Sequence, residues 1–401
     1  MKPFRSLVSH SEALESILST VRIIERTEVV PIDSAVDRVL AEDVIADMNV
    51  PPFSRAAMDG YAVLAEDTFK ATSLAPVRLR LVGVIHTGEL SDKKVSDGEC
   101  VQIATGCPIP DGANAVVMVE FTEAVGNEIA ISRPVYPGAN IAPEGEDLKK
   151  GERSLRAGEL LAPGKIGILA ALGRTHVKVL AQPTVAVLPT GKEVVPVGSS
   201  LEKGQVYDIN SHTLISIINT NGGRAVQLPI ASDSLDDLAK TITRGSEADL
   251  IVVSGGSSVG QRDLLVDTVE TLGKILFHGV QVSPGKPTLF GIIQGKPIFG
   301  MPGYPTSCLS NAYLFLVPAL RKMANLPPKG TIEVRAKMAQ RVVSTLGRKE
   351  FLTVTLKDGE AYPLFKKSGA ITAMAKADGY VVVPENLDVL EKGDEVIVTL
   401  L

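Results

Sequence analysis

The stretch that decides the fold is residues 248–263, ADLIVVSGGSSVGQRD. It contains a short apolar run, residues 250–253, followed by a glycine- and serine-rich turn, residues 254–258. An apolar run of this length between a polar lead-in and a turn predicts a strand that is buried on both faces of a parallel sheet. Glycine lets the backbone pass close to a ligand, and free N–H groups at the start of the next helix favour an anion. Because ligands of open α/β sheets bind outside the carboxyl ends of the strands, we expect the main site here.

A second interpretation of residues 254–258 stays open at this point. The turn between a strand and a helix often needs glycine for its geometry alone, without any ligand. The glycine- and serine-rich run by itself does not choose between a binding loop and a simple turn.

Composition bounds the class of protein. The chain has 401 residues, of which 45% are hydrophobic and 22% charged, and this predicts a soluble protein of two to four domains. A formal charge of -5 argues against a nucleic-acid partner, whose binding surface is usually basic. The sequence has no apolar run of about 18 residues and no apolar leader at its start, so we expect no membrane span and a cytoplasmic location. The three cysteines form neither a zinc pattern nor a disulfide framework, which fits a reducing cytosol; they are Cys100, Cys107 and Cys308.

Changes of periodicity along the chain predict an α/β multidomain protein. Consecutive prolines at 51 and 52 begin a β-rich segment, a βαβ alternation starts near residue 184, and a proline-rich linker at 326–330 precedes a final strand-rich segment. We therefore expect an N-terminal α+β domain, an inserted β-rich domain, a central doubly wound βαβ domain and a C-terminal β-barrel. Their predicted ranges are, in that order, 1–50 with 138–180, 51–137, 181–326 and 330–401.

Individual elements follow from the same signals. A capping box at Ser9 and Glu12 begins a helix that we expect to end near Arg26, and a second short helix is expected at 36–40. In the insert, strands are expected near 61–64, 77–85, 100–104, 115–119 and 129–131. In the final segment, strands are expected near 332–336, 351–356, 379–383 and 395–400.

Four acidic residues follow predicted strand ends in the βαβ region: Glu193, Asp208, Asp233 and Asp263. Parallel strands present their carboxyl ends along one edge of a sheet, so these carboxylates are expected to converge. Such oxygens beside glycine-rich turns suit Mg²⁺ that bridges phosphate groups. For any single acid, a helix N-cap or an exposed charge is the slightly better explanation, and Asp233 before Leu235 fits an N-cap. Four acids after four strands together favour a functional site.

Two turns could add to this site. Residues 283–287, Ser-Pro-Gly-Lys-Pro, form a rigid turn around Gly285 that presents Lys286, which is suited to phosphate but is equally suited to be a solvated surface charge. Pro302 and Pro305 give a stiff loop whose helix N–H groups face the cleft, unless they only begin a helix. In the insert, Asp59 and Thr105 are candidates whose roles the residues alone leave open, since both residue types also form turns.

Eight motifs taken together resemble a known family. In chain order they are AMDGYAV (57–63), ATGCPIPDGANAVVMVE (104–120), GANI with GED and KGE (138–152), PTGKEVV (189–195), GQVYDIN (204–210), SGGSSVGQRD (254–263), PGKPTLFG (284–291) and GMPGYPTS (300–307). This order resembles the molybdopterin molybdenumtransferases, the MoeA family, to which the E domain of gephyrin is similar. The resemblance extends over essentially the whole chain, including the insert and the C-terminal barrel.

The resemblance implies an enzyme that inserts molybdate into the dithiolene of adenylylated molybdopterin, with Mg²⁺ as cofactor and with release of AMP. It also implies a homodimer, in which the insert of one subunit and the βαβ domain of the other form the cleft, and a molybdopterin adenylyltransferase as substrate donor. The catalytic residues it implies are Asp59, Thr105, Asp233, Asp263 and Lys286. The implied metal ligands are Glu193, Asp208 and Asp263, and the implied binding residues are Ser254, Gly255, Gly256, Ser257, Ser258, Gly285, Pro302 and Pro305.

Four positions depart from the family pattern: Ser283, Tyr304, Thr353 and the segment 142–144. The family often has Lys, Asn, Arg and basic residues there, respectively, so three of the changes remove positive charge from a site for anions. Each lost contact would weaken phosphate or oxyanion binding by about 1–3 kcal/mol. Two alternatives therefore stand beside molybdate insertion: a tungstate insertase, and a non-catalytic molybdopterin-binding or scaffold protein.

Overall fold

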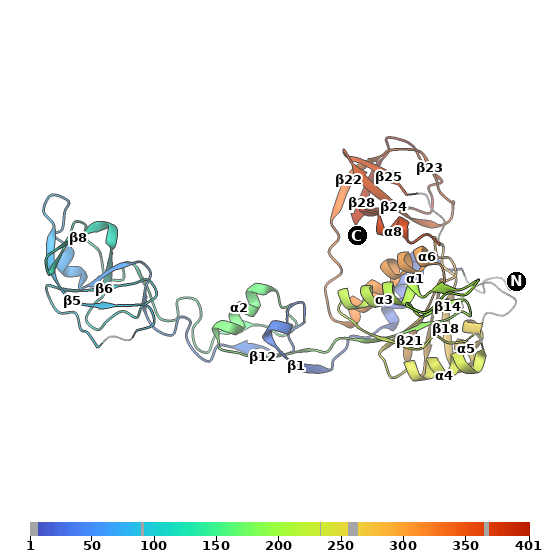
Figure 1. Cartoon of the computed structure of the whole chain (residues 1–401), viewed down its shortest axis with the longest axis horizontal. Helices are drawn as coiled ribbons and strands as arrows, with labels where there is room; N and C mark the ends of the chain where they lie inside the picture. The colour runs from blue at the N-terminus through green and yellow to red at the C-terminus, as the bar shows by residue number, and fades with distance from the viewer. Residues whose placement is uncertain (1–6, 90–91, 233, 256–263, 365–368) are drawn as a thin grey trace. The chain divides into compact units, whose positions relative to one another are not determined.

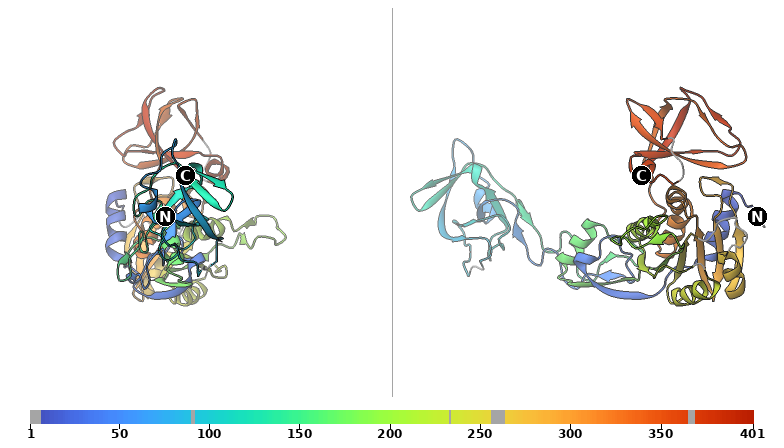
Figure 2. Two further views of the ribbon diagram at one scale, coloured as in Figure 1. Left: turned by 90° about the vertical axis from the view of Figure 1, so that its left-hand side faces the viewer. Right: turned by 45° about the vertical axis from the view of Figure 1, so that its right-hand side comes forward.

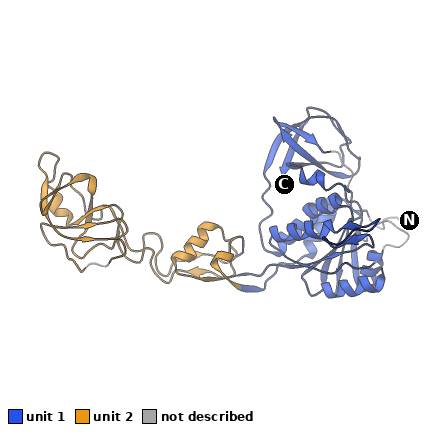
Figure 3. Ribbon diagram, viewed as in Figure 1, with its two compact units in different colours: residues 1–28, 37–39, 179–401 blue, residues 29–36, 40–178 orange. Residues whose placement is uncertain are grey.

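The structure is a computed structural model that describes residues 7–89, 92–232, 234–255, 264–364 and 369–401 (Figure 1, with two further views in Figure 2). The chain divides into two compact units (Figure 3). Unit 1 comprises residues 1–28, 37–39 and 179–401, and unit 2 comprises residues 29–36 and 40–178. The finer division into four domains stays a prediction.

The centre of unit 1 is a six-stranded sheet around β17 (Leu250–Ser254), the strand predicted from residues 250–253. The strand order is β16-β13-β17-β21-β20-β18, and the first four strands pair in parallel. β20 pairs antiparallel with β21, and β18 pairs antiparallel with β20. The other strands are β16 (Arg224–Gln227), β13 (Thr184–Pro189), β21 (Lys296–Met301), β20 (Leu289–Ile293) and β18 (Gly273–His278). The mostly parallel order confirms the predicted α/β architecture.

Alternating residues of the central strands explain why helices cover both faces of this sheet. Val185 and Val187 belong to one buried cluster, and Ala186 and Leu188 belong to another. The first cluster receives α1, α3, α6 and α7, and the second receives α4 and α5 (Figure 1). These helices are α1 (His10–Thr20), α3 (Ile209–Thr220), α4 (Leu235–Gly245), α5 (Leu264–Leu272), α6 (Pro305–Asn311) and α7 (Val317–Met323).

Two helix predictions need correction, and one further helix is irregular. The capping box of Ser9 is present, but α1 ends at Thr20 instead of near Arg26. Val21 is already extended, and the backbone N–H of Ile24 bonds to the distant carbonyl of Met323. The last helix of the sheet region is interrupted by a π-helical segment, Ala312–Leu316. No helix forms at the described residues 36–40, since this stretch bonds to distant backbone: Leu40 N–H donates to Glu159, and Leu180 N–H donates to Val39.

The C-terminal strands of unit 1 close into a five-stranded barrel, which confirms the predicted barrel. The ring runs β24, β25, β22, β28, β26 and returns to β24, while the short β19 (Val282–Ser283) pairs in parallel with β24 outside the ring. Its core is the buried face of these strands. The strands are β22 (Glu333–Met338), β24 (Lys349–Lys357), β25 (Glu360–Pro363), β26 (Gly379–Val383) and β28 (Glu395–Leu400), of which β25 was not predicted.

Unit 2 contains a second six-stranded sheet, in the order β7-β4-β6-β5-β9-β8, with a buried cluster on each face. Its strands match the predicted positions in the insert except for β8, which was missed. They are β4 (Gly60–Val63), β5 (Val77–Ile85), β6 (Glu99–Ile103), β7 (Ala115–Met118), β8 (Thr122–Val125) and β9 (Glu128–Ile131).

The rest of the N-terminal region consists of two-stranded pairs and one helix. The helix α2 (Pro163–Ala171) begins at a proline and is followed by Gly173 at φ 68°, two residues typical of a helix start and a helix end. The pairs are β1 (Thr27–Pro31) with β12 (His176–Leu180), β2 (Val44–Ile45) with β11 (Arg153–Leu155), and β3 (Arg55–Ala56) with β10 (Ile141–Ala142).

Candidate functional site

The loops that leave β13, β17 and β21 meet at the carboxyl edge of the parallel strands. The backbone N–H of Thr190 donates to the carbonyl of Ser254 at 2.9 Å, and the N–H of Gly255 donates to the carbonyl of Met301 at 3.1 Å. The Thr190 hydroxyl donates to the same Ser254 carbonyl at 3.2 Å. Main-chain hydrogen bonds therefore lock the three loops together at the edge where an α/β sheet binds its ligand.

Gly255 must be glycine at this junction. Its φ is 91°, and a Cβ placed there would lie 2.7 Å from the carbonyl oxygen of Thr190. Both the backbone conformation and the close approach exclude a larger residue. At Gly255, therefore, the geometry of the turn is by itself sufficient to require glycine. It leaves open a further binding role, because Gly256, Ser257 and Ser258 lie outside the described residues.

Asn210 joins two of these loops, and the sequence analysis missed it. Its Nδ2 donates to the hydroxyl of Ser254 and to the carbonyl of Gly303, each at 2.8 Å. Because a carbonyl can only accept, the contact with Gly303 fixes the orientation of the amide. Its Oδ1 is buried and has no hydrogen-bond partner among the described residues. The only sequence signal for Asn210 is the GQVYDIN motif, in which the charge of Asp208 is the more prominent feature.

Asp208 caps α3 with one of its two carboxylate oxygens. Oδ1 accepts from the N–H of Ser211 at 3.0 Å, which confirms the N-cap interpretation. The side chain belongs to a residue only 4% exposed, and its buried Oδ2 has no hydrogen-bond partner among the described residues. A buried carboxylate oxygen without a partner is costly, so this atom fits a cation as its missing partner.

The predicted metal set is brought together only in part. The position that a Cβ would take on Gly191 lies 3.0 Å from a carboxylate oxygen of the exposed Glu193, so this carboxylate folds over the loop after β13. Glu193 precedes β14 (Val194–Val195) and Asp208 follows β15 (Val206–Tyr207), and these two strands pair in parallel. Their backbones are thus about three residues apart along the strand direction, roughly 10 Å.

The third predicted ligand, Asp263, lies outside the described residues, as does Asp233. Within the described ranges, no three His, Cys, Asp or Glu side chains are grouped so that they could hold one metal ion. The proposed N-cap role of Asp233 is corrected, since Ser234 caps α4 by accepting from the N–H of Asp237 at 3.2 Å.

Cys308 is buried beneath the same edge and is chemically inert. Burial raises the pKa of its thiol to about 12, although a hydrogen bond with Ser254 opposes the rise and the nearby charge of Asp208 adds to it. A thiol with so high a pKa is not a nucleophile at neutral pH. All three cysteines are free and buried, so none offers a reactive group to the site.

The turn that carries Lys286 lies in the same unit. Lys286 is half-buried, and its carbonyl accepts from the N–H groups of Val280 and Thr288, each at 2.9 Å. Gly285 is buried at φ 108°. Pro302 is buried after β21, and Pro305 is the first residue of α6, as its sequence predicts. Backbone bonds from Val280, before the turn, and from Thr288, after it, therefore hold the Lys286 turn in place.

In unit 2, the structure brings Asp59 and Thr105 together. Asp59 Oδ1 accepts from the N–H of Thr105 at 2.7 Å and from its hydroxyl at 2.8 Å. These bonds lower the pKa of the exposed Asp59, so its carboxylate is ionised at neutral pH. The pair therefore presents one fixed negative charge on the surface of unit 2, with the second oxygen, Oδ2, not engaged by Thr105.

The four departures from the family pattern have different surroundings. Thr353 is only 5% exposed, within β24, whereas Tyr304 is 65% exposed next to the start of α6. Ser283 is half-buried in β19, and Glu144 is exposed in unit 2. Among the residues that the structure describes, no helix has the length and apolar character needed to cross a membrane.

Comparison with known proteins agrees with this architecture. Residues 8–173 match the MoeA N-terminal region (domain I and II), residues 186–322 match a probable molybdopterin binding domain, and residues 335–401 match the MoeA C-terminal region (domain IV). The chain is similar to a putative molybdopterin biosynthesis protein of Methanocaldococcus jannaschii, at 36% identity over 94% of this chain and 93% of that protein.

Two further relatives agree with this assignment. The chain is 31% identical to a molybdopterin molybdenumtransferase of Staphylococcus aureus, over 88% of this chain and 86% of that protein. A crystal structure of the molybdopterin biosynthesis MoeA protein from Pyrococcus horikoshii covers 98% of this chain and 99% of that chain, at 41% identity and a TM-score of 0.84. On the identity and coverage of these matches, the chain belongs to the MoeA family, which includes enzymes named as transferases.

Proposed function

We propose that this protein inserts molybdate into the dithiolene of adenylylated molybdopterin and releases AMP, in the biosynthesis of the molybdenum cofactor. The relatives named molybdopterin molybdenumtransferase support the reaction class. The observation that carries the proposal is the junction of Thr190, Ser254 and Gly255 at the carboxyl edge of the sheet. This edge is where an α/β sheet binds anionic ligands, and a nucleotide-linked pterin phosphate is such a ligand.

The chain's own groups would act mainly by binding and by charge neutralisation. The close-packed glycine at 255 lets the backbone approach an anionic group, and the ammonium of Lys286 would balance phosphate charge. Preorganised donors of this kind stabilise negative charge that develops when a pyrophosphate bond breaks. The remaining residues proposed for binding are Gly256, Ser257, Ser258, Gly285, Pro302 and Pro305.

Mg²⁺ is the proposed cofactor. Asp208 would hold it, because its buried Oδ2 has no partner among the described residues, and Glu193 and Asp263 are the other proposed ligands. When bound, the ion would neutralise phosphate oxygens as a Lewis acid. Asp208 is the member of this set whose surroundings support the assignment, because Glu193 is exposed.

We further propose that the protein works as a cytoplasmic homodimer. The insert of one subunit would supply Asp59 and Thr105 to the cleft, and the βαβ domain of the other subunit would supply Asp233, Asp263 and Lys286. The ionised carboxylate of Asp59, held by Thr105, supports a role in orienting a donor group or a hydrated cation. A molybdopterin adenylyltransferase would deliver the substrate.

The direct test measures AMP release from adenylylated molybdopterin with molybdate, with tungstate and without an oxyanion. We expect oxyanion- and Mg²⁺-dependent AMP release, and loss of it in Asp263→Ala. If neither oxyanion supports turnover, the enzymatic proposal fails. A preference for tungstate would instead support the tungstate insertase, since the two oxyanions have the same charge and nearly the same shape.

One observation favours a second candidate, a non-catalytic molybdopterin-binding or scaffold protein. Ser283, Thr353 and the segment 142–144 lack the positive charge that is common in the family. Residue 353 is a buried threonine, which has no charged group to offer an anion. This candidate predicts that isothermal titration detects molybdopterin binding while the AMP assay detects no turnover.

A further inference from the structure

The turn that carries Lys286 is folded around a buried asparagine from a distant helix. Asn311, the last residue of α6, is fully buried, and its Nδ2 donates to the carbonyl of Gly285 at 2.8 Å. The same carbonyl accepts from the hydroxyl of Thr288 at 2.8 Å. The Asn311 amide also donates to this hydroxyl, so the three residues form a closed set of hydrogen bonds. The peptide group directly before Lys286 is therefore held by side chains.

Packing at Gly285 makes this arrangement specific. A Cβ at Gly285 would lie 2.6 Å from the Oδ1 of Asn311 and closer still to its Nδ2. A Cβ atom does not approach other heavy atoms this closely, so the turn packs against the Asn311 amide only because residue 285 is glycine. The φ of 108° at Gly285 adds a second reason for glycine. The glycine and the asparagine thus form one matched contact.

Two features of Asn311 set it apart from an ordinary core residue. Its Oδ1 is buried and has no hydrogen-bond partner among the described residues, which is an unfavourable state for a structural amide. It also directly precedes the π-helical segment Ala312–Leu316. π-helical segments are rare in proteins, and many of those that occur lie at functional sites. Neither feature is expected of a residue whose only role is to fill the core.

We infer that Asn311 is a positioning residue that sets the place of the Lys286 ammonium through the Gly285 peptide. The inference rests on the proposed function, in which Lys286 binds phosphate. The carbonyl of Lys286 is anchored by Val280 and Thr288, and the carbonyl of Gly285 by Asn311 and Thr288. Asn311 thus connects the turn to helix α6, through its hydrogen bond to the Gly285 carbonyl. Loss of this contact leaves the lysine charge in the protein but no longer holds it in place.

The test measures binding of inorganic pyrophosphate to the full chain by isothermal titration. Variants Asn311→Ala, Lys286→Met and the double variant form a thermodynamic cycle. We expect each single change to weaken binding by about tenfold, the value of one hydrogen bond to a charged group. In the Lys286→Met background, Asn311→Ala is expected to have almost no further effect, because Asn311 acts through the lysine.

Two further variants separate positioning from general destabilisation. Asn221→Ala is the matched control: Asn221 is 3% exposed, and its Nδ2 donates to the carbonyl of Ile217 at 2.8 Å near the end of α3. It should lower the melting temperature as Asn311→Ala does but leave pyrophosphate affinity unchanged. Thr288→Val, which removes the other side-chain donor to Gly285, should weaken pyrophosphate binding in the direction of Asn311→Ala.

A pH profile adds a readout that loss of packing would not change. In Asn311→Asp, the new side chain can donate to the Gly285 carbonyl only when protonated, and burial favours the protonated form. The affinity of this variant relative to the native chain should therefore rise as the pH falls from about 8 to about 5.5. The corresponding ratio for Asn311→Ala should stay constant.

The outcomes are distinguishable. If Lys286→Met binds pyrophosphate as the native chain does, or if the native chain does not bind it, the phosphate role of Lys286 is wrong and the inference falls with it. If Lys286→Met weakens binding but Asn311→Ala does not, or if the two changes are additive, the role of Asn311 alone is overturned.

Discussion

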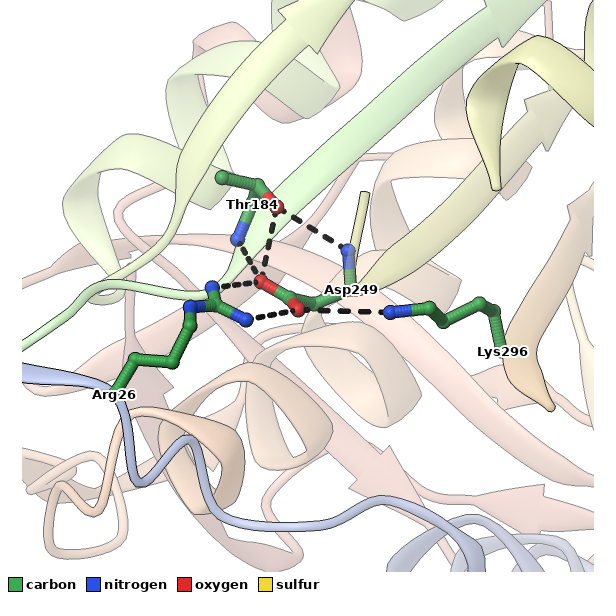
Figure 4. Close-up of polar contacts among 4 residues, drawn as sticks. All are labelled: Arg26, Thr184, Asp249 and Lys296. Atoms are coloured by element: carbon green, nitrogen blue, oxygen red, sulfur yellow. Dashed lines mark hydrogen bonds and ion pairs between the residues drawn. The ribbon is translucent and has the colours of Figure 1, made fainter. Parts of the chain in front are cut away.

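The guanidinium of Arg26 donates two hydrogen bonds to the carboxylate of Asp249, at 2.8 and 2.7 Å (Figure 4). The same carboxylate accepts from the N–H and the hydroxyl of Thr184, at 2.8 and 2.9 Å, and Lys296 lies 3.9 Å away. Asp249 directly precedes β17, and Thr184 begins β13, so this cluster sits at the amino ends of the parallel strands. The cluster thus lies at the opposite ends of these strands from the candidate site.

We expect Asp249→Asn to lower the free energy of unfolding by about 2 kcal/mol, because the asparagine cannot accept all the charge-assisted bonds of the carboxylate. The effect is moderated by Arg26, whose side chain is 57% exposed while that of Asp249 is 6% exposed. Urea unfolding measures the change. The control is Glu391→Gln, which breaks an ion pair to Arg341 in which both side chains are 61% exposed. This control should cost less than about 0.5 kcal/mol. Equal effects of the two changes would contradict the structural role of Asp249.

The same carboxylate predicts a pH dependence of stability. Burial would raise the pKa of Asp249, but the bonds from Arg26 and Thr184 outweigh it and lower the pKa from 3.8 to about 2. A folded-state pKa below the unfolded one gives stability that is present above about pH 4 and is lost as the pH falls toward 2. The difference in unfolding free energy between the native chain and Asp249→Asn should be constant from about pH 5 to 8 and shrink below about pH 4. A difference that grows on acidification would refute this assignment.

Gly255→Ala should be more harmful than alanine at another glycine with the same backbone. Gly204 has a φ of 94° and open space where a Cβ would lie, whereas Gly255 has a φ of 91° and the Thr190 carbonyl oxygen 2.7 Å from that position. We expect Gly204→Ala to cost about 1 kcal/mol from backbone strain alone, and Gly255→Ala to cost at least about twice that. Chemical unfolding gives both values. Similar losses of stability in the two variants would contradict this prediction, because they would show that the Thr190 carbonyl can move away from a Cβ at residue 255 at little cost.

Asp208→Asn should separate the capping role from the metal role. Its Oδ1 can still cap α3, but the change removes charge from the buried Oδ2 that has no partner among the described residues. Without Mg²⁺ we expect an equal or higher melting temperature, because an unpaired buried charge is lost. Added Mg²⁺ should raise the melting temperature of the native chain and not that of Asp208→Asn. Asp236→Asn, at an exposed acid in the first turn of α4, is the control and should respond to Mg²⁺ like the native chain.

Most elements were predictable because their signals are local. The apolar run before Ser254 predicted β17, and the capping box of Ser9 and Glu12 predicted the start of α1. The end of α1 was not predicted, because the chain leaves the helix at Val21 and Ile24 then bonds to Met323, which is remote in sequence. Likewise β25 becomes a strand by closing the barrel, and its own four residues carry too weak a pattern.

The candidate site divides in the same way. Its glycines, its acids and Lys286 could be named as candidates from the sequence, because short motifs reveal turn geometry and charge. Asn210 and Asn311 were not found, since an asparagine has no pattern of its own and each acts on loops that are remote along the chain. Asn210 reaches Gly303 across 93 positions, and Arg26 reaches Asp249 across 223. The sequence by itself therefore determined most of the strands and turns, and all of the charges, of this protein. Only the tertiary structure decided which buried polar groups meet, because a hydrogen bond between distant residues exists only once the sheet has brought them within about 3 Å.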